Sequence, residues 1–248
     1  MTSGLAMAVA SLRLFASNFI AAAILMALPV VLSSALVLAS VGEFGLYHFS
    51  LELARAAMMV LFGAAFLRVL LNGQGLSLQT FQFGWNEFRF AIWSVILGLA
   101  FVAWRLVYFA LMGLMMVFAV AGGLDINSEI FKTSINVGLV ITFGYFVVRY
   151  LGVGPALIAG QPKIRQAADQ AWRDSGANIK AHFVAAVVLI VPVTLLGLAG
   201  IELAKSVFAD GVMVHTVGRS TLDYVLLAVV LCLSAVVFQS LAESKESR

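Results

Sequence analysis

Long apolar runs dominate the chain, and short polar stretches separate them. A helix crosses a bilayer core of about 30 Å with roughly 20 apolar residues. Six runs reach about that length, and each predicts a membrane-spanning helix: about 15–40, 53–72, 91–121, 133–159, 179–204 and 221–242. This pattern predicts an all-α fold, a polytopic membrane helix bundle of six transmembrane helices that forms a single domain, 1–248.

The stretch 163–175 follows a different pattern, because its apolar and small residues recur three and four positions apart. Such a one-sided stripe predicts an amphipathic helix. Lying in the headgroup plane, this helix would place Trp172 at the interface and bring Lys163 and Arg165 to anionic lipid. A second interpretation stays open, in which the segment is a connector helix packed against the bundle without lipid specificity.

The chain also shows a weak internal repeat at an offset of 87 residues. Segment 70–113 aligns with 157–200, with eight identities in 44 positions, and Trp85 falls opposite Trp172. Each unit runs from a span through a Gly-Gln turn and a tryptophan-containing interfacial segment to the next span. The two units lie two spans apart, which predicts a parallel repeat about an axis along the membrane normal. The repeat therefore predicts a second cytoplasmic interfacial amphipathic helix, before Trp85.

Glycine and proline mark ends and interruptions within these units. Gly73 and Gly160 each follow an apolar run and predict helix C-caps. Pro155 lies inside the fourth span, where it removes a backbone donor and crowds the preceding turn. It therefore predicts a kink after Tyr150.

One stretch of the chain carries a series of features in a fixed order. An arginine within a span is followed six residues later by a proline, then by a short turn and an alanine-rich helix that ends near a tryptophan. The positions are Arg149, Pro155, Gln161, Ala167, Ala171, Trp172 and Ser175. Over about 50–205 the chain resembles the membrane domain of bacterial glycerophosphoryl diester phosphodiesterases and related six-span bacterial membrane families of unknown function. The turn carries Gly160-Gln161 where those families usually have an acid. No phosphodiesterase catalytic domain is present, so the resemblance implies an accessory role and no catalysis.

Composition and charge agree with a membrane protein. Of the 248 residues, 62% are hydrophobic and 11% charged, whereas soluble domains are about 25% charged. One side of the predicted spans holds nine basic residues and the other holds four. The nine are Arg13, Arg68, Arg89, Lys163, Arg165, Arg173, Lys180, Lys245 and Arg248; the four are Arg55, Lys132, Lys205 and Arg219. The positive-inside rule therefore predicts cytoplasmic termini. Scattered charges without a basic and aromatic patch argue against nucleic-acid binding.

Two arginines fall inside predicted spans. Arg105 lies 14 residues into the third span, about 21 Å along the helix, and Arg149 lies ten residues before the end of the fourth. An arginine at the bilayer centre costs about 2.5–3.5 kcal/mol. One hypothesis is that both line a polar cavity for an anionic solute or lipid phosphate. The other is that they snorkel, or bind backbone carbonyls such as those that Pro155 frees.

The chain offers little for catalysis or metal binding. His48, His182 and His215 lack metal-ligand spacing, and we expect interfacial positions for them. No nucleophile elbow, phosphate loop or complete dinucleotide motif occurs, and Cys232 is the single cysteine. The sequence therefore predicts no cofactor, no metal site and no enzyme.

The function predicted first is a non-catalytic integral protein of the bacterial inner membrane, a lipid-interacting or scaffolding module. The paired interfacial segments and the resemblance favour it. The alternative is a small transporter or channel for an anionic solute or lipid, which the intramembrane arginines and the kinked span favour. An intramembrane enzyme is the third possibility.

Overall fold

The computed structural model describes residues 3–39, 46–73, 84–121, 138, 141–142, 144–161, 163–176, 178–208 and 211–246. Within these residues all regular structure is helical. The helices are α1 (Gly4–Ser17), α2 (Phe19–Ala39), α3 (Leu46–Asn72), α4 (Trp85–Ala121), α6 (Val153–Ile158), α7 (Ile164–Gly176), α8 (Ile179–Val207) and α9 (Gly211–Glu246).

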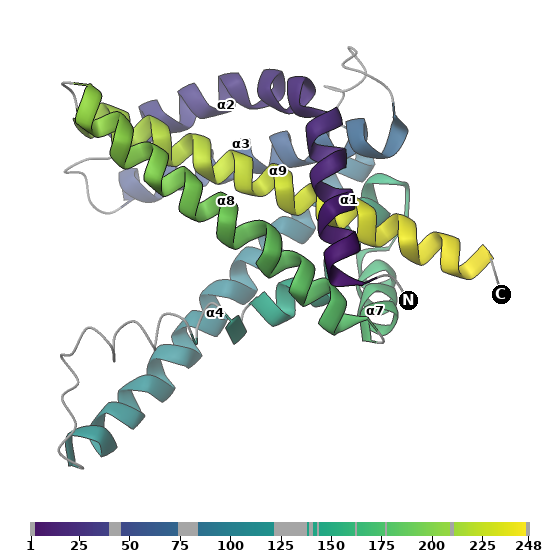
Figure 1. Ribbon diagram of the computed structural model, residues 1–248. Coiled ribbons are helices and arrows are strands. Elements are labelled where there is room, and N and C mark those ends of the chain that lie inside the picture. The colour runs from purple at the N-terminus through teal and green to yellow at the C-terminus, as the bar shows by residue number, and fades with distance from the viewer. Residues whose placement is uncertain are drawn as a thin grey trace.

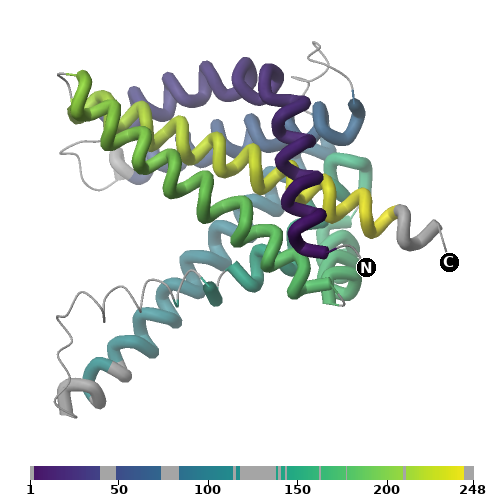
Figure 2. The backbone as a smooth tube through the Cα atoms, viewed as in Figure 1, coloured from purple at the N-terminus to yellow at the C-terminus, as the bar shows by residue number. Residues whose placement is uncertain are grey.

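Helix α9 is the centre of the bundle and packs against α1, α2, α3, α6 and α8 (Figure 1). Its buried residues cover most of its circumference, as expected for a helix that is apolar all round: Leu222, Tyr224, Ala228, Val229, Leu231, Cys232, Leu233, Ala235 and Val237. Helix α4 diverges from the bundle along most of its length (Figure 2). The beginning of α1, helix α7 and the end of α9 lie at the same end of the molecule.

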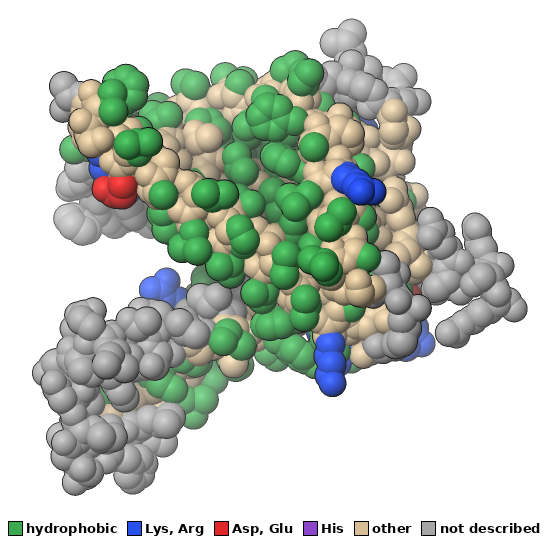
Figure 3. Space-filling model, in the orientation of Figure 1, with side chains coloured by type: hydrophobic (Ala, Val, Ile, Leu, Met, Phe, Trp, Pro, Cys, Tyr) green, Lys and Arg blue, Asp and Glu red, His purple; other side chains and the backbone are tan. Residues whose placement is uncertain are grey.

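Among the described residues, five helices are long and apolar enough to cross a membrane: α2, Phe49–Asn72 in α3, Trp85–Gly113 in α4, α8, and Gly211–Ala242 in α9. Hydrophobic side chains cover much of the outer face, and charged ones lie mainly towards its ends (Figure 3). A water-soluble fold would bury such a surface, whereas lipid solvates it. The chain is therefore compatible with an integral membrane protein, as its hydropathy predicts.

The fourth predicted span, 133–159, lies partly outside the described residues. Its described part is a shorter apolar helical stretch, Gly144–Ile158, which turns at Tyr150–Gly152 before α6 begins. Pro155 is the third residue of α6, in the first turn, where a missing N–H leaves no intrahelical bond unmade. The interruption therefore precedes the proline.

The first predicted span, 15–40, divides into two helices at Asn18. The backbone N–H of Asn18 donates to the carbonyls of Leu14 and Phe15, and its side-chain amide donates to the Leu14 carbonyl at 2.9 Å. Its own carbonyl accepts from Ala22 at 2.9 Å and starts α2. One asparagine thus ends α1 and begins α2, so that α1 lies across α8 and α9 (Figure 1).

Two glycines have positive φ angles and follow helix ends, +60° at Gly73 after α3 and +102° at Gly160 after α6. At Gly160 the backbone bonds are those of a Schellman motif. The N–H of Gln161 donates to the carbonyl of Ala156 at 3.0 Å, and the N–H of Gly160 donates to that of Leu157 at 3.1 Å. This cap turns the chain sharply from α6 into α7.

Candidate lipid-facing site at one end of the bundle

Helix α7 is fixed to the bundle through small residues. Ala167, Ala171 and Ser175 are buried, and both alanines belong to a core cluster that contains Trp93 of α4. The opposite face is charged and open: the side chain of Arg165 is 94% exposed, and its Nε lies 3.8 Å from Asp169 Oδ2. Lys163 is exposed as well. The helix is therefore packed against the bundle on one face and open on the other.

Arg149 lies against Trp172 of α7. Its guanidinium carbon is 4.5 Å from the centroid of the Trp172 ring, and Nη1 donates to the Trp172 carbonyl at 3.2 Å. Nε and Nη2 donate to the Tyr145 hydroxyl at 3.3 and 3.0 Å. A cation over an aromatic face is stabilised by the ring quadrupole, and positive charge is favoured near a helix C-terminus. Arg149 thus joins the segment before α6 to the last turns of α7.

Aromatic rings continue this contact into α4. The Trp172 ring lies 5.6 Å from that of Tyr150, which lies 5.5 Å from that of Trp93. Trp93 is buried, whereas Trp172 is 39% exposed at the edge of the bundle. An indole placed in this way suits the boundary between apolar chains and headgroups.

The carbonyl four positions before Pro155 has a partner other than Arg149. The residue four positions before Pro155 is Leu151, and its carbonyl accepts from the buried hydroxyl of Ser234 on α9. A serine of a neighbouring helix is a common solution in membrane proteins. Arg149 does not bind this carbonyl and contacts α7 instead.

Arg105 has separate surroundings on α4. It is exposed, and its guanidinium lies 5.4 Å from the centroid of the Phe109 ring, one turn along the same helix. Trp93, which contacts Tyr150 beside Arg149, lies 12 residues earlier, about 18 Å along the helix axis. The two arginines therefore have different partners.

The first unit of the predicted repeat is only partly described, because residues 74–83 lie outside the described chain. Trp85 is the first residue of α4. Its exposed ring stacks on Phe88 at 5.1 Å, and Arg89 lies 5.6 Å from the ring centroid. Each tryptophan of the repeat thus carries an arginine on its ring.

Sequence reasoning missed a buried ion pair at this end of the molecule. Arg68 of α3 pairs with Glu87 of α4, whose side chain is 6% exposed. Glu87 also accepts the backbone N–H of Gly84 at 2.8 Å, and Asn86 donates to the carbonyl of Ile158 at 3.4 Å. A glutamate three residues after an N-cap is the signal that could have indicated its place, since it reaches back as in a capping box. These contacts hold the start of α4 against α3 and α6.

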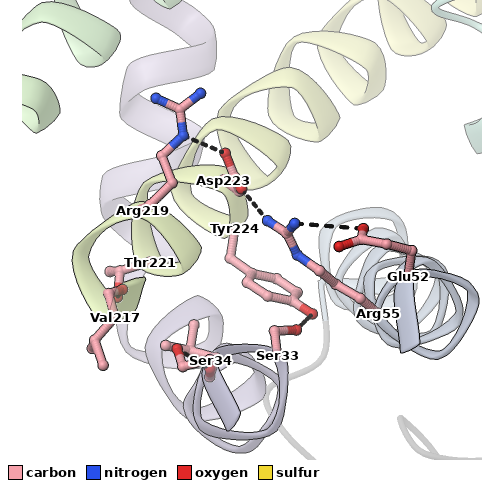
Figure 4. A network of polar contacts seen from close by, with 10 residues as sticks. Ser33, Ser34, Glu52, Arg55, Val217, Arg219, Thr221, Asp223 and Tyr224 are labelled. Atoms are coloured by element: carbon pink, nitrogen blue, oxygen red, sulfur yellow. Dashed lines mark hydrogen bonds and ion pairs between the residues drawn. The ribbon is translucent and has the colours of Figure 1, made fainter. Parts of the chain in front are cut away.

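A second polar network joins α2, α3 and α9 (Figure 4). Arg55 of α3 donates to Asp223 of α9 at 2.5 Å and lies 3.8 Å from Glu52, and Arg219 lies 3.8 Å from Asp223. The hydroxyl of Tyr224 is hydrogen-bonded at 2.9 Å to that of Ser33 in α2, in a buried position. Glu52 and Arg55 belong to α3, whereas Arg219, Asp223 and Tyr224 belong to α9.

His182, one of the three histidines predicted to lie at the interface, is near the start of α8. Its side chain is 0% exposed and packs on the face of α8 that carries Ala185, Ala186 and Leu189. Among the described residues its two ring nitrogens have no hydrogen-bond partner. In the same part of the chain no group of three or more His, Cys, Asp or Glu side chains could hold a metal ion.

Comparison with protein-family models, with curated proteins and with solved structures finds no match to this chain. The resemblance to the phosphodiesterase membrane domain stays a prediction.

Proposed function

We propose that the chain is a non-catalytic module of the bacterial inner membrane that binds anionic lipid through α7, with both termini in the cytoplasm. One observation carries the proposal: α7 is fixed by buried alanines, while Arg165 on its open face and Lys163 directly before the helix are exposed, and Trp172 is 39% exposed. Basic residues and tryptophan on a helix at the end of apolar spans suit the headgroup layer.

The distribution of charge supports the orientation. Figure 1 places α7, the beginning of α1 and the end of α9 at one end. That end also carries Arg68 and Arg89, at the end of α3 and the start of α4. The anionic cytoplasmic leaflet attracts basic residues near its surface.

Native mass spectrometry of the detergent-purified chain tests lipid binding. Each basic residue near an anionic surface contributes about 1 kcal/mol, so Lys163→Gln with Arg165→Gln should weaken retention of phosphatidylglycerol or cardiolipin about 30-fold. Lys205→Gln, at the far end of α8, is the control and should retain the lipid. Equal retention by the double variant and the wild type would reject α7 as the binding element.

A small transporter or channel for an anionic solute or lipid is the second candidate. The observation that favours it is the network of Arg55, Asp223 and Arg219, which lies on helices long and apolar enough to span. Ionisable groups in such positions often mark solute paths. Transport predicts uptake of radiolabelled phosphate or carboxylate into proteoliposomes that Asp223→Asn abolishes. Uptake equal to that of empty vesicles would reject it for these solutes.

A further inference from the structure

A cavity of about 350 Å³ opens at the corner where α6, α7 and α9 meet. Its volume falls in the range of small-molecule sites, about 300–1,000 Å³. Seven of its twelve lining residues are glycine or alanine, so that short side chains leave the space: Gly152, Ala156, Ala159, Gly160, Ala167, Ala171 and Ala242. The charged outer face of α7 is not part of this lining.

The cavity lies at the level where the apolar spans end. The apolar stretch of α9 ends at Ala242, and the wall from α9 consists of Phe238, Leu241 and Ala242. The facing wall belongs to the amphipathic helix α7 and to the turn at Gly160. A ligand there would have an apolar neighbour on one side and polar neighbours on the other, as a phospholipid headgroup does at its glycerol end.

The polar groups of the lining favour a cation with several N–H donors. Asp174 is the one charged residue among the described side chains of the lining, and Gln161 and Gln170 add two amide oxygens. A carboxylate and two amide oxygens are acceptors, and a primary ammonium group has three donors. A quaternary ammonium has no N–H donor and is recognised by cages of several aromatic rings, whereas Phe238 is the aromatic residue of this lining.

We propose that this cavity binds the primary ammonium group of an ethanolamine phospholipid, with Asp174, Gln161 and Gln170 as acceptors. The site is separate from the anionic-lipid surface proposed above, because Lys163 and Arg165 do not line it. Either proposal can therefore fail alone. Helix α7 would then contribute to two lipid sites. Its exposed side would bind anionic headgroups, and its side facing the cavity would bind an ammonium group.

The test is native mass spectrometry of the full chain in micelles that contain equal amounts of phosphatidylethanolamine and phosphatidylcholine with identical acyl chains. The wild type should retain the ethanolamine lipid at least fivefold over the choline lipid. Asp174→Asn should abolish this preference without changing side-chain shape. Asp169→Asn makes the same change on the exposed face of α7, 62% exposed at its side chain, and should leave the preference intact.

A second variant tests the cavity without changing the charge of Asp174. Ala242→Phe fills the cavity from α9 and should also abolish the preference for the ethanolamine lipid. Equal retention of the two lipids by the wild type, or equal loss in Asp169→Asn, would overturn the proposal. Soluble phosphoethanolamine in millimolar excess should not displace the lipid, and displacement would overturn the lipid as the source of the ammonium group. The preference should survive in the Lys163→Gln, Arg165→Gln variant, which tests the other site.

Discussion

Arg149 shows how a strongly apolar chain accommodates a charged side chain. The guanidinium lies on the Trp172 ring and donates to the Trp172 carbonyl and the Tyr145 hydroxyl, so it has both an aromatic and two polar partners. A planar guanidinium can stack and donate at the same time, whereas an ammonium group cannot. Geometry as well as charge therefore makes an arginine suitable at this position.

Arg149→Lys should destabilise the protein nearly as much as Arg149→Gln, by about 1–2 kcal/mol, because both variants lose the stacked fork. Thermal unfolding in detergent measures this. Arg105→Lys is the matched control and should unfold as the wild type does, since Arg105 lies over one phenylalanine on its own helix. An Arg149→Lys variant as stable as the wild type would show that charge alone matters here.

For His182, we expect a substitution to raise the stability of the protein, whereas those of Arg149 lower it. Its buried ring nitrogens are without hydrogen-bond partners among the described residues, and an unsatisfied buried polar group costs about 1–3 kcal/mol. His182→Leu should therefore raise the stability measured by chemical unfolding. Ser33→Ala, which removes a buried bond to Tyr224, should lower it. A loss of stability in His182→Leu would mean that the imidazole has a partner in solution.

At the scale of elements, α1 lies across α8 because its first residue has no side chain. Ser3 caps the helix by accepting the N–H of Ala6 at 3.2 Å. A Cβ added to Gly4 would lie 2.6 Å from the backbone oxygen of Ala181 and 2.9 Å from the Cβ of Val184. The backbone of α8 has little freedom to move away, so the glycine sets how closely the two helices approach.

Gly4→Ala should lower the free energy of unfolding by about 1–3 kcal/mol, as overpacking does. Gly200→Ala is the control within α8, because nothing lies within 4 Å of the added Cβ, and it should leave stability unchanged or raise it by up to about 1 kcal/mol. Denaturant unfolding in mixed micelles measures both. Equal stabilities of the two variants would contradict the contact between α1 and α8.

Hydropathy predicted the helical membrane character of the chain, because that character depends on long apolar runs that are visible directly in the sequence. It missed the break at Asn18, since one asparagine scarcely changes the mean hydropathy of a long run. It also did not indicate that α9 begins at Gly211, ten residues before the predicted span at 221, because polar residues of its first turns, such as His215 and Arg219, resemble a loop. Element boundaries depend on single capping bonds that a hydropathy average does not resolve.

At the scale of the whole molecule, ion pairs connect residues of different helices. Arg55 and Asp223 are separated by 168 positions, and Arg68 and Glu87 lie on different helices. No spacing rule connects such residues, so sequence reasoning could name Arg149 and Trp172 singly as site residues but not their contact, and it overlooked Glu87. The sequence therefore predicted individual residues of the candidate site, and the structure added the contacts between them.

The Arg55 and Asp223 pair, partly buried between α3 and α9, should couple the two helices. A double-mutant cycle with Arg55→Gln and Asp223→Asn should give a coupling free energy of about 1–3 kcal/mol. The exposed pair of Lys205 and Glu202 is the control, and it should show no measurable coupling. Additive effects of Arg55→Gln and Asp223→Asn would mean that the pair does not hold the bundle together.

The depth of α7 in a membrane tests the central claim most directly. Spin labels on single cysteines in a Cys232→Ala background, at Arg165 and at Trp172, report contact with lipid-soluble oxygen and with a water-soluble nickel complex. The label at 172 should favour oxygen and lie at the boundary of headgroups and acyl chains, while the label at 165 should favour nickel. Two labels that both meet only the nickel complex would place α7 in water and contradict its role as a lipid-binding helix.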